Sequence, residues 1–122
     1  MKAMDKWKVF EFPDEPKISI TEYGVTFNRG VAQALNRPKY ALILFDEENK
    51  LMAVKPCKSN EENKINFYKS EKVLNVRLPH KMLKKYIEKL LSIDLHINAY
   101  KCCGEFKDGA VVFNLNECEK VY

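Results

Sequence analysis

The side chains best suited to chemistry in this chain are four cysteines and two histidines. They are Cys57, Cys102, Cys103 and Cys118, with His80 and His96. No two cysteines form a C-x-x-C pair, and neither histidine stands at zinc-ligand spacing from them. Because the first residues lack the apolar run of an export signal, the thiols are most simply reduced. We therefore expect buried or half-buried structural cysteines, with a metal site as the less favoured alternative.

Paired carboxylates are the next candidates, since two neighbouring acids can act as general acid and base. Glu47-Glu48 and Glu61-Glu62 are such pairs, but both stand in polar stretches typical of a turn and a linker. The chain has four glycines, and it contains no glycine-rich phosphate loop, no G-x-S-x-G and no H-E-x-x-H. These features predict a protein that is not an enzyme and needs no cofactor.

The charge balance permits nucleic-acid binding without requiring it. Against 17 Asp and Glu the chain has 21 Lys and Arg, which gives a net charge of +4. With 122 residues it is long enough for one domain with a real core. No stretch is apolar and long enough to span a bilayer, so we expect a cytoplasmic protein without membrane contact.

The elements that would position these side chains begin with a pattern in residues 18–57. Alternating apolar residues predict a strand on each side of a turn at Tyr23-Gly24. Asn28 is a good N-cap for a short helix over residues 29–35, and Asn36 can take the left-handed position after it. An apolar hairpin with an acidic turn closes the unit.

A looser copy of this pattern runs through residues 73–118. Its first strand enters a helix over residues 79–92, and the apolar stripe of that helix, which begins at Met82, is the clearest periodic signal in the chain. A second hairpin follows, with strands at residues 95–102 and 110–115. We therefore predict an α+β fold in one domain, a small β-barrel or two-layer β structure built from two strand-helix-hairpin units with the helices outside.

Residues 1–16 precede both copies, and residues 58–72 form a polar linker between them. From Trp7 to Phe12 the side chains alternate, with aromatic residues on both faces. Either this segment is an edge strand of the sheet, or it is an arm that docks on a partner. Together with the apolar run at residues 40–45 it supplies more apolar surface than one small barrel buries, so we expect a homodimer.

Several motifs in residues 18–57 occur together in one known family. They are Gly24-Val25-Thr26-Phe27-Asn28, the helix that ends at Leu35, the apolar strand after it, the turn DEENK and the run LMAVKP. In this combination they resemble the looped-hinge, swapped-hairpin domain of AbrB- and MraZ-type transcription factors. In that family two such units interleave into one barrel, from two chains or in tandem within one chain. The resemblance implies DNA binding, and the contacts would come from Lys17, Arg29, Arg37 and Lys39 at one end of the barrel.

The leading hypothesis is thus a small DNA-binding transcriptional regulator that contacts phosphates through Lys and Arg. Two departures from the family favour an alternative. Val25 stands where the family usually has a basic residue, and Gln33 stands within the helix where the family's arginines contribute to DNA binding. The alternative is a non-enzymatic phage or mobile-element protein that binds and inhibits a host protein or sequesters a ligand.

Overall fold

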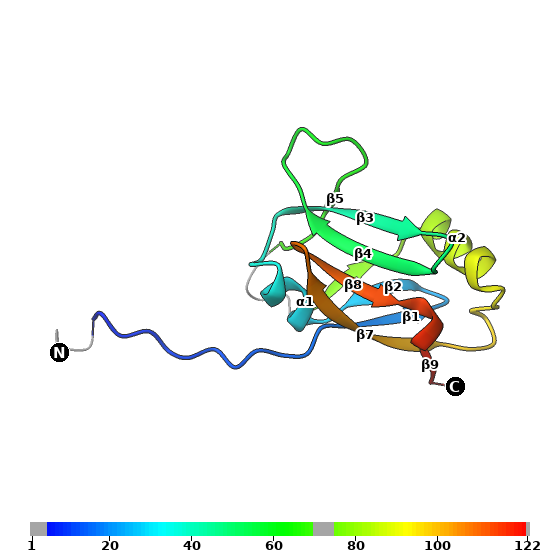
Figure 1. The fold of residues 1–122 in the computed structure, drawn as a ribbon, viewed down its shortest axis with the longest axis horizontal. Helices are drawn as coiled ribbons and strands as arrows, with labels where there is room; N and C mark the ends of the chain where they lie inside the picture. The colour runs from blue at the N-terminus through cyan, green and yellow to red at the C-terminus, as the bar shows by residue number, and fades with distance from the viewer. Residues whose placement is uncertain (1–4, 70–74, 122) are drawn as a thin grey trace.

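The computed structural model describes residues 5–69 and 75–121, and strands dominate them (Figure 1). The strands are β1 Lys17–Thr21, β2 Gly24–Phe27, β3 Tyr40–Asp46, β4 Leu51–Pro56, β5 Ile65–Asn66, β6 Val76–Leu78, β7 Tyr100–Lys107, β8 Ala110–Asn114 and β9 Glu119–Lys120. The helices are α1 Arg29–Ala34, α2 Lys81–Leu91 and the 3₁₀ turn η2 Leu115–Glu117. None of the described helices is long and apolar enough to cross a membrane. Three predicted segments extend beyond the described residues. They are the arm at residues 1–4, the linker at residues 70–72 and the second unit at residues 73–74.

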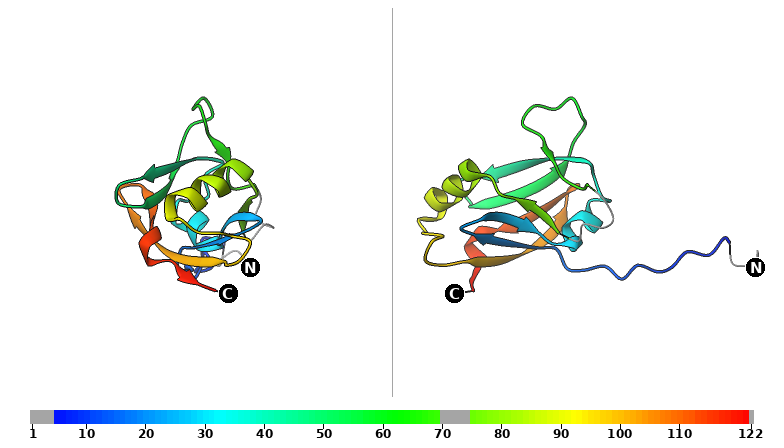
Figure 2. Two further views of the ribbon diagram at one scale, coloured as in Figure 1. Left: turned by 90° about the vertical axis from the view of Figure 1, so that its right-hand side faces the viewer. Right: turned by 180° about the vertical axis from the view of Figure 1, so that it is seen from behind.

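The strands form one antiparallel sheet in the order β5-β3-β4-β8-β7-β1-β2-β6, with β9 beside β7. This sheet curls into a half-barrel, so that strands distant in the order face one another across the core (Figure 2). The predicted α+β class and the small, mostly β domain are confirmed at this level.

Three phenylalanines form the centre of the core. Phe27, Phe67 and Phe113 are fully buried. The Phe27 ring centroid lies 5.4 Å from that of Phe67 and 6.4 Å from that of Phe113. Around them the strands contribute every second side chain, as Ile18 and Ile20 of β1 do. Burial of each such side chain stabilises the fold by about 1.5–3 kcal/mol. The helix α1 has only six residues, too few to be stable by helix propensity alone, so its buried residues such as Val31 must hold it by packing on this core.

The two helices lie at opposite ends of the half-barrel (Figures 1 and 2), and α1 has the ends that its sequence predicts, whereas α2 begins at Lys81, two residues later than predicted. The side chain of Asn28 caps α1 by accepting a backbone hydrogen bond, and Asn36 takes the left-handed conformation after it, with φ 60°. In α2 the cap is His80, and Ser92 ends the helix with φ 55°.

The second hairpin starts later than predicted. Its first strand, β7, begins at Tyr100 and turns at Asp108-Gly109 with φ 52° and 79°, a dipeptide favoured in two-residue hairpin turns. Residues 95–99 form no strand, because the Asp94 carbonyl accepts two backbone hydrogen bonds of 3.2 Å each and closes a turn there. The prediction of a strand over residues 95–99 is therefore wrong.

The N-terminal arm forms no edge strand. Residues 7–12 run away from the body beyond its α1 end (Figure 1), and Val9 is 96 % exposed. The Pro16 carbonyl still accepts a hydrogen bond from the Gly104 amide of β7 at 2.8 Å, but Pro13 and Pro16 have no N–H group to donate in return. The edge-strand prediction is therefore wrong, and the alternative of a docking arm stays a prediction.

Candidate nucleic-acid interface

The four cations predicted to bind DNA lie around the two ends of α1. Lys17 opens β1 and Arg29 opens α1. Asn28 holds the first residues of β1 and α1 side by side. Its backbone N–H donates to the Lys17 carbonyl at 3.0 Å, and its side-chain Oδ1 accepts a hydrogen bond from the backbone N–H of Lys17 at 2.9 Å. Arg37 follows the helix with φ 51°, and Lys39 comes just before β3. All four therefore belong to the α1 end of the half-barrel.

The N-terminal arm comprises residues 5–16, and its last part, from Glu11 onward, lies against this end and sets carboxylates against the arginines. The Oδ2 atom of Asp14 lies 2.9 Å from Nε of Arg29. A carboxylate oxygen of Glu11 accepts a hydrogen bond from Nη2 of Arg37. The two arginines thus form ion pairs within the chain.

Gln33, in the middle of α1, fixes the position of the arm. Its Oε1 accepts the Asp14 amide at 2.9 Å, and its Nε2 donates to Oε1 of Glu11 at 2.7 Å. The hydrogen bond from Gln33 is the main cause of the lowered pKa of Glu11. In the same way, the hydrogen bond to Asp14 is the main cause of the raised pKa of Arg29. Gly30 allows the close approach, since a Cβ there would lie only 2.6 Å from the Asp14 carbonyl oxygen.

The two lysines of the predicted set are less closely paired. Nζ of Lys17 lies 4.0 Å from a carboxylate oxygen of Glu15. Nζ of Lys39 lies 5.6 Å from the centre of the Tyr40 ring, and Nζ of Lys64 lies 5.7 Å from the same ring centre. Lys64 was not predicted from sequence, and with Lys39 it places two ammonium groups at the start of β3.

All these ion pairs are open to solvent, as the exposed fractions of 48 % for the Arg29 side chain and 44 % for that of Asp14 show. Exposed pairs are weak and are screened by salt. The α1 end therefore carries two arginines whose solvent-exposed ion pairs are made with an acidic segment of the same chain.

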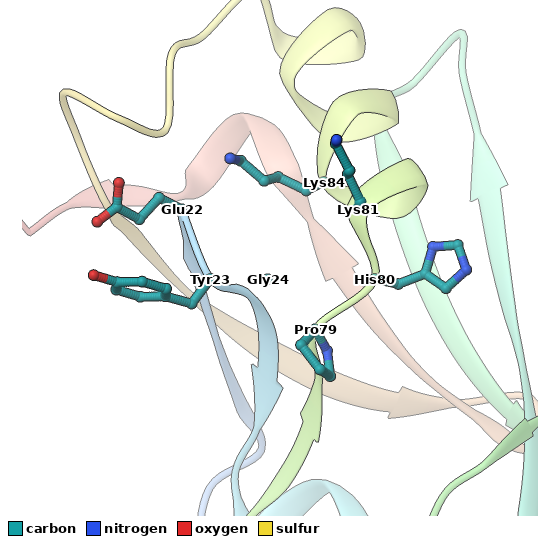
Figure 3. A pocket seen from close by; sticks show the side chains of 7 residues that line it. All are labelled: Glu22, Tyr23, Gly24, Pro79, His80, Lys81 and Lys84. Carbon is teal, nitrogen blue, oxygen red and sulfur yellow. The ribbon is translucent and has the colours of Figure 1, made fainter.

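The opposite end of the half-barrel carries a second basic region at the start of α2 (Figure 3). A hollow of about 270 Å³ lies there, lined by Glu22, Tyr23, Gly24, Pro79, His80, Lys81 and Lys84. Lys84 extends from α2 toward the side of Glu22 (Figure 3). Nδ1 of His96 lies 3.1 Å from Oε2 of Glu22. Hydrogen bonds with Tyr23 and His96, and then the charges of His96 and Lys84, lower the pKa of Glu22. This end therefore also has an acid beside its cations.

The cysteines are free thiols in the described structure. Cys102 is buried and donates to the Asn114 carbonyl at 3.2 Å, whereas the next residue, Cys103, is exposed, as strand alternation predicts. The expectation that all four are at least half-buried is wrong for Cys103. A hydrogen bond between the thiols of Cys102 and Cys118 lowers the pKa of the first and raises that of the second. Within the described residues no group of three or more His, Cys, Asp or Glu could hold a metal ion.

No family model, no curated protein and no solved structure matches this chain. Besides Lys64, sequence reasoning missed the two acids at the α1 end, Glu11 and Asp14. Glu11 is 26 residues from Arg37 in the sequence, and Asp14 is 15 residues from Arg29. No rule based on local spacing can predict such contacts. The only signal in the sequence is the placement of acids between the aromatic residues and prolines of the arm.

Proposed function

We propose that this protein is a small DNA-binding transcriptional regulator with an AbrB/MraZ-like fold, built from two related strand-helix-hairpin units. The observation that carries the proposal is the order of strands in the sheet. Suppose that each strand of the first half is exchanged with its counterpart in the second half: β1 with β5, β2 with β6, β3 with β7 and β4 with β8. Every pair of neighbouring strands in the order then becomes a pair that is also present, except β1–β2, which would become β5–β6. The chain would then be a tandem version of a barrel that other members of the family assemble from two units.

Two strand contacts lie at the centre of this proposed symmetry. β2 pairs with β6 so that Thr26 faces Arg77, and β4 pairs with β8 so that Ala53 faces Val112. In each contact a strand of the first half meets its own counterpart, as a two-fold relation requires. The second helix follows β6 as α1 follows β2, and the second hairpin β7–β8 follows α2 as β3–β4 follows α1.

A fold by itself does not establish a function, so the second support comes from the cations at the α1 end. Arg29 and Arg37 flank a helix that follows directly on β2, which is where the resemblance places DNA contacts. Lys17, Lys39 and Lys64 add charge at the same end. Phosphates would replace the carboxylates of Glu11 and Asp14, so the arm would compete with DNA for the arginines.

The second candidate is a non-enzymatic protein that binds a host protein. It is favoured by the same arm, because both arginines are already paired and because the aromatic side chains of residues 7–12 face solvent. In this case the α1 end holds the arm in position, and the exposed aromatic residues make the contact.

An anisotropy titration with labelled genomic DNA fragments at low and moderate salt separates the two candidates. The regulator is expected to bind with a dissociation constant below about 1 µM at low salt and to weaken steeply as salt rises, because each phosphate contact contributes about 0.9 to the salt slope. Absence of binding tighter than about 1 µM at low salt would exclude the regulator.

A further inference from the structure

The half-barrel has an open seam between β3 and β6. On one side β3 pairs with β4 from Ala41 to Asp46, but on its other side β5 pairs only with Tyr40 and Ala41. β6 pairs with β2 on one side. Among the described residues no strand pairs with residues 42–46 of β3 on this side or with the second edge of β6. Unpaired strand edges of this kind can each accept an added strand.

An apolar groove of about 620 Å³ lies along this seam, between the two edges and α2. Its apolar lining consists of Ile43, Phe45, Ile65, Leu78, Met82 and Leu83. Met82, which helical periodicity placed in the core, is instead 67 % exposed at the mouth of the groove. The groove is therefore a hydrophobic surface of the size that one strand with two large side chains could cover.

The other half of the domain shows what a strand does in the equivalent place. There β1 lies between β7 and β2 and pairs with both. It buries Ile18 and Ile20, two residues apart, almost completely. In the seam, β5 pairs only with the first two residues of β3, and no other described strand occupies the rest of that length. Residues 58–64, which precede β5, cannot supply the missing side chains, because they are all polar and their loop stands away from the body (Figure 1).

The N-terminal arm carries the side chains that the seam lacks. Phe10 and Phe12 are two residues apart on one face of an extended segment, with ring centroids 4.8 Å apart. They are 69 % and 77 % exposed. The arm is held at the α1 end by its acids and runs away from α2 (Figures 1 and 2), so it does not reach the groove of its own chain.

We propose that the arm of a second copy of this chain fills the seam as an added β-strand. Phe10 and Phe12 enter the groove, and the backbone of the arm pairs with β3 and β6. Glu11 points to the opposite face of the strand, so its bond to Arg37 of its own chain is compatible with docking. Two copies that exchange arms in this way form a closed two-fold dimer.

Charge supports the direction of the added strand. To pair antiparallel with β3, as β5 does, the arm must place its N-terminal end near the turn after β3. Lys6 and Lys8 of the arm then come close to the acidic pair Glu47 and Glu48. The proposal is independent of DNA binding and would hold for either candidate function.

Sedimentation equilibrium of the full chain tests the proposal. The wild type is expected to approach twice the 14.3 kDa of one chain as concentration rises. The double variant Phe10→Ala with Phe12→Ala removes four buried Phe side chains from the two-fold dimer, so it should weaken dimerisation at least about 10⁴-fold, since each side chain is worth about tenfold or more. Met82→Glu should weaken it by about tenfold or more. Ile97→Glu is the matched control, because Ile97 is 66 % exposed outside the groove, and it should change dimerisation by less than about twofold.

Mixing the variants gives a second, sharper test. The arm variant keeps an intact groove, and the Met82→Glu chain keeps an intact arm, so the mixed pair can form one complete contact whereas neither protein alone can. We expect the mixture to form heterodimers at concentrations where each variant is monomeric. A wild type that stays monomeric at high micromolar concentration would overturn the proposal and leave the groove to another protein. Equal effects of Met82→Glu and Ile97→Glu, or no heterodimer on mixing, would also overturn it.

Discussion

Removal of the arm's negative charges should strengthen DNA binding at the α1 end. The variant Glu11→Gln with Asp14→Asn keeps side chains of the same size, and the new amide oxygens can still accept hydrogen bonds from Gln33 and the arginines. It removes the two carboxylates that pair with Arg37 and Arg29. DNA would then bind both arginines without displacing an intramolecular charge.

The salt dependence gives the magnitude of this effect. Each cation that becomes available for a phosphate adds about 0.9 to the slope of log K against log salt, so two arginines add up to about 1.8. Because exposed ion pairs are individually weak, we expect the affinity at low salt to rise by about 3- to 30-fold. Anisotropy titrations of the wild type and the variant at several salt concentrations measure both quantities.

The control must separate the arginines from net charge. Glu61→Gln with Glu62→Gln removes the same two charges from the exposed loop before β5. This control is expected to raise the affinity by less than about threefold and to leave the slope nearly unchanged. If both double variants act equally, only net charge matters, and the idea that the arm covers a DNA-binding surface is wrong.

Three further predictions concern the arm and the core. The lowered pKa of Glu11 means that its contact with α1 favours the ionised carboxylate, so the contact is at full strength above pH 4.5 and is lost as pH falls through the lowered pKa. The side-chain amide signals of Gln33 in an NMR pH titration should shift over this range. Signals that stay constant down to about pH 2 would contradict the prediction. Gly104→Ala should destabilise the domain by about 1–3 kcal/mol in a urea denaturation, because the added Cβ would lie 2.5 Å from the Phe113 ring; an unchanged midpoint would contradict this packing. Asn28→Ala removes the cap of α1 and should lower stability by about 1–2 kcal/mol in the same assay, whereas Asn28→Ser, which can still cap, should recover part of it; equal losses in both variants would contradict a capping role.

Local patterns in the sequence were enough to predict the backbone features around α1. The turn glycine Gly24, the cap Asn28 and the left-handed Asn36 each depend on neighbouring residues, and each was found where it was expected. The second hairpin was placed wrongly because residues 95–99 alternate like a strand. There, Asp94 closes a turn whose hydrogen bonds outweigh the alternation.

The candidate site was harder to predict because its partners are distant in sequence. The cations at the α1 end came from the resemblance to a family, but the acids that cover them come from the arm. The pairing of Glu11 with Arg37 requires knowledge of where the arm crosses α1, which local periodicity does not contain. Met82 likewise lies on the apolar stripe of α2, and only the three-dimensional position of the open seam explains its exposure.

The central claim is that DNA binds at the α1 end, and one comparison tests it most directly. Arg29→Ala with Arg37→Ala is measured beside Lys84→Ala with Lys85→Ala, in the same salt-dependent anisotropy assay. We predict that the arginine pair weakens binding substantially and lowers the salt slope by up to about two units, and that the lysine pair on α2 does much less. A larger loss from the lysine pair would place the DNA-binding surface on α2 and contradict the account.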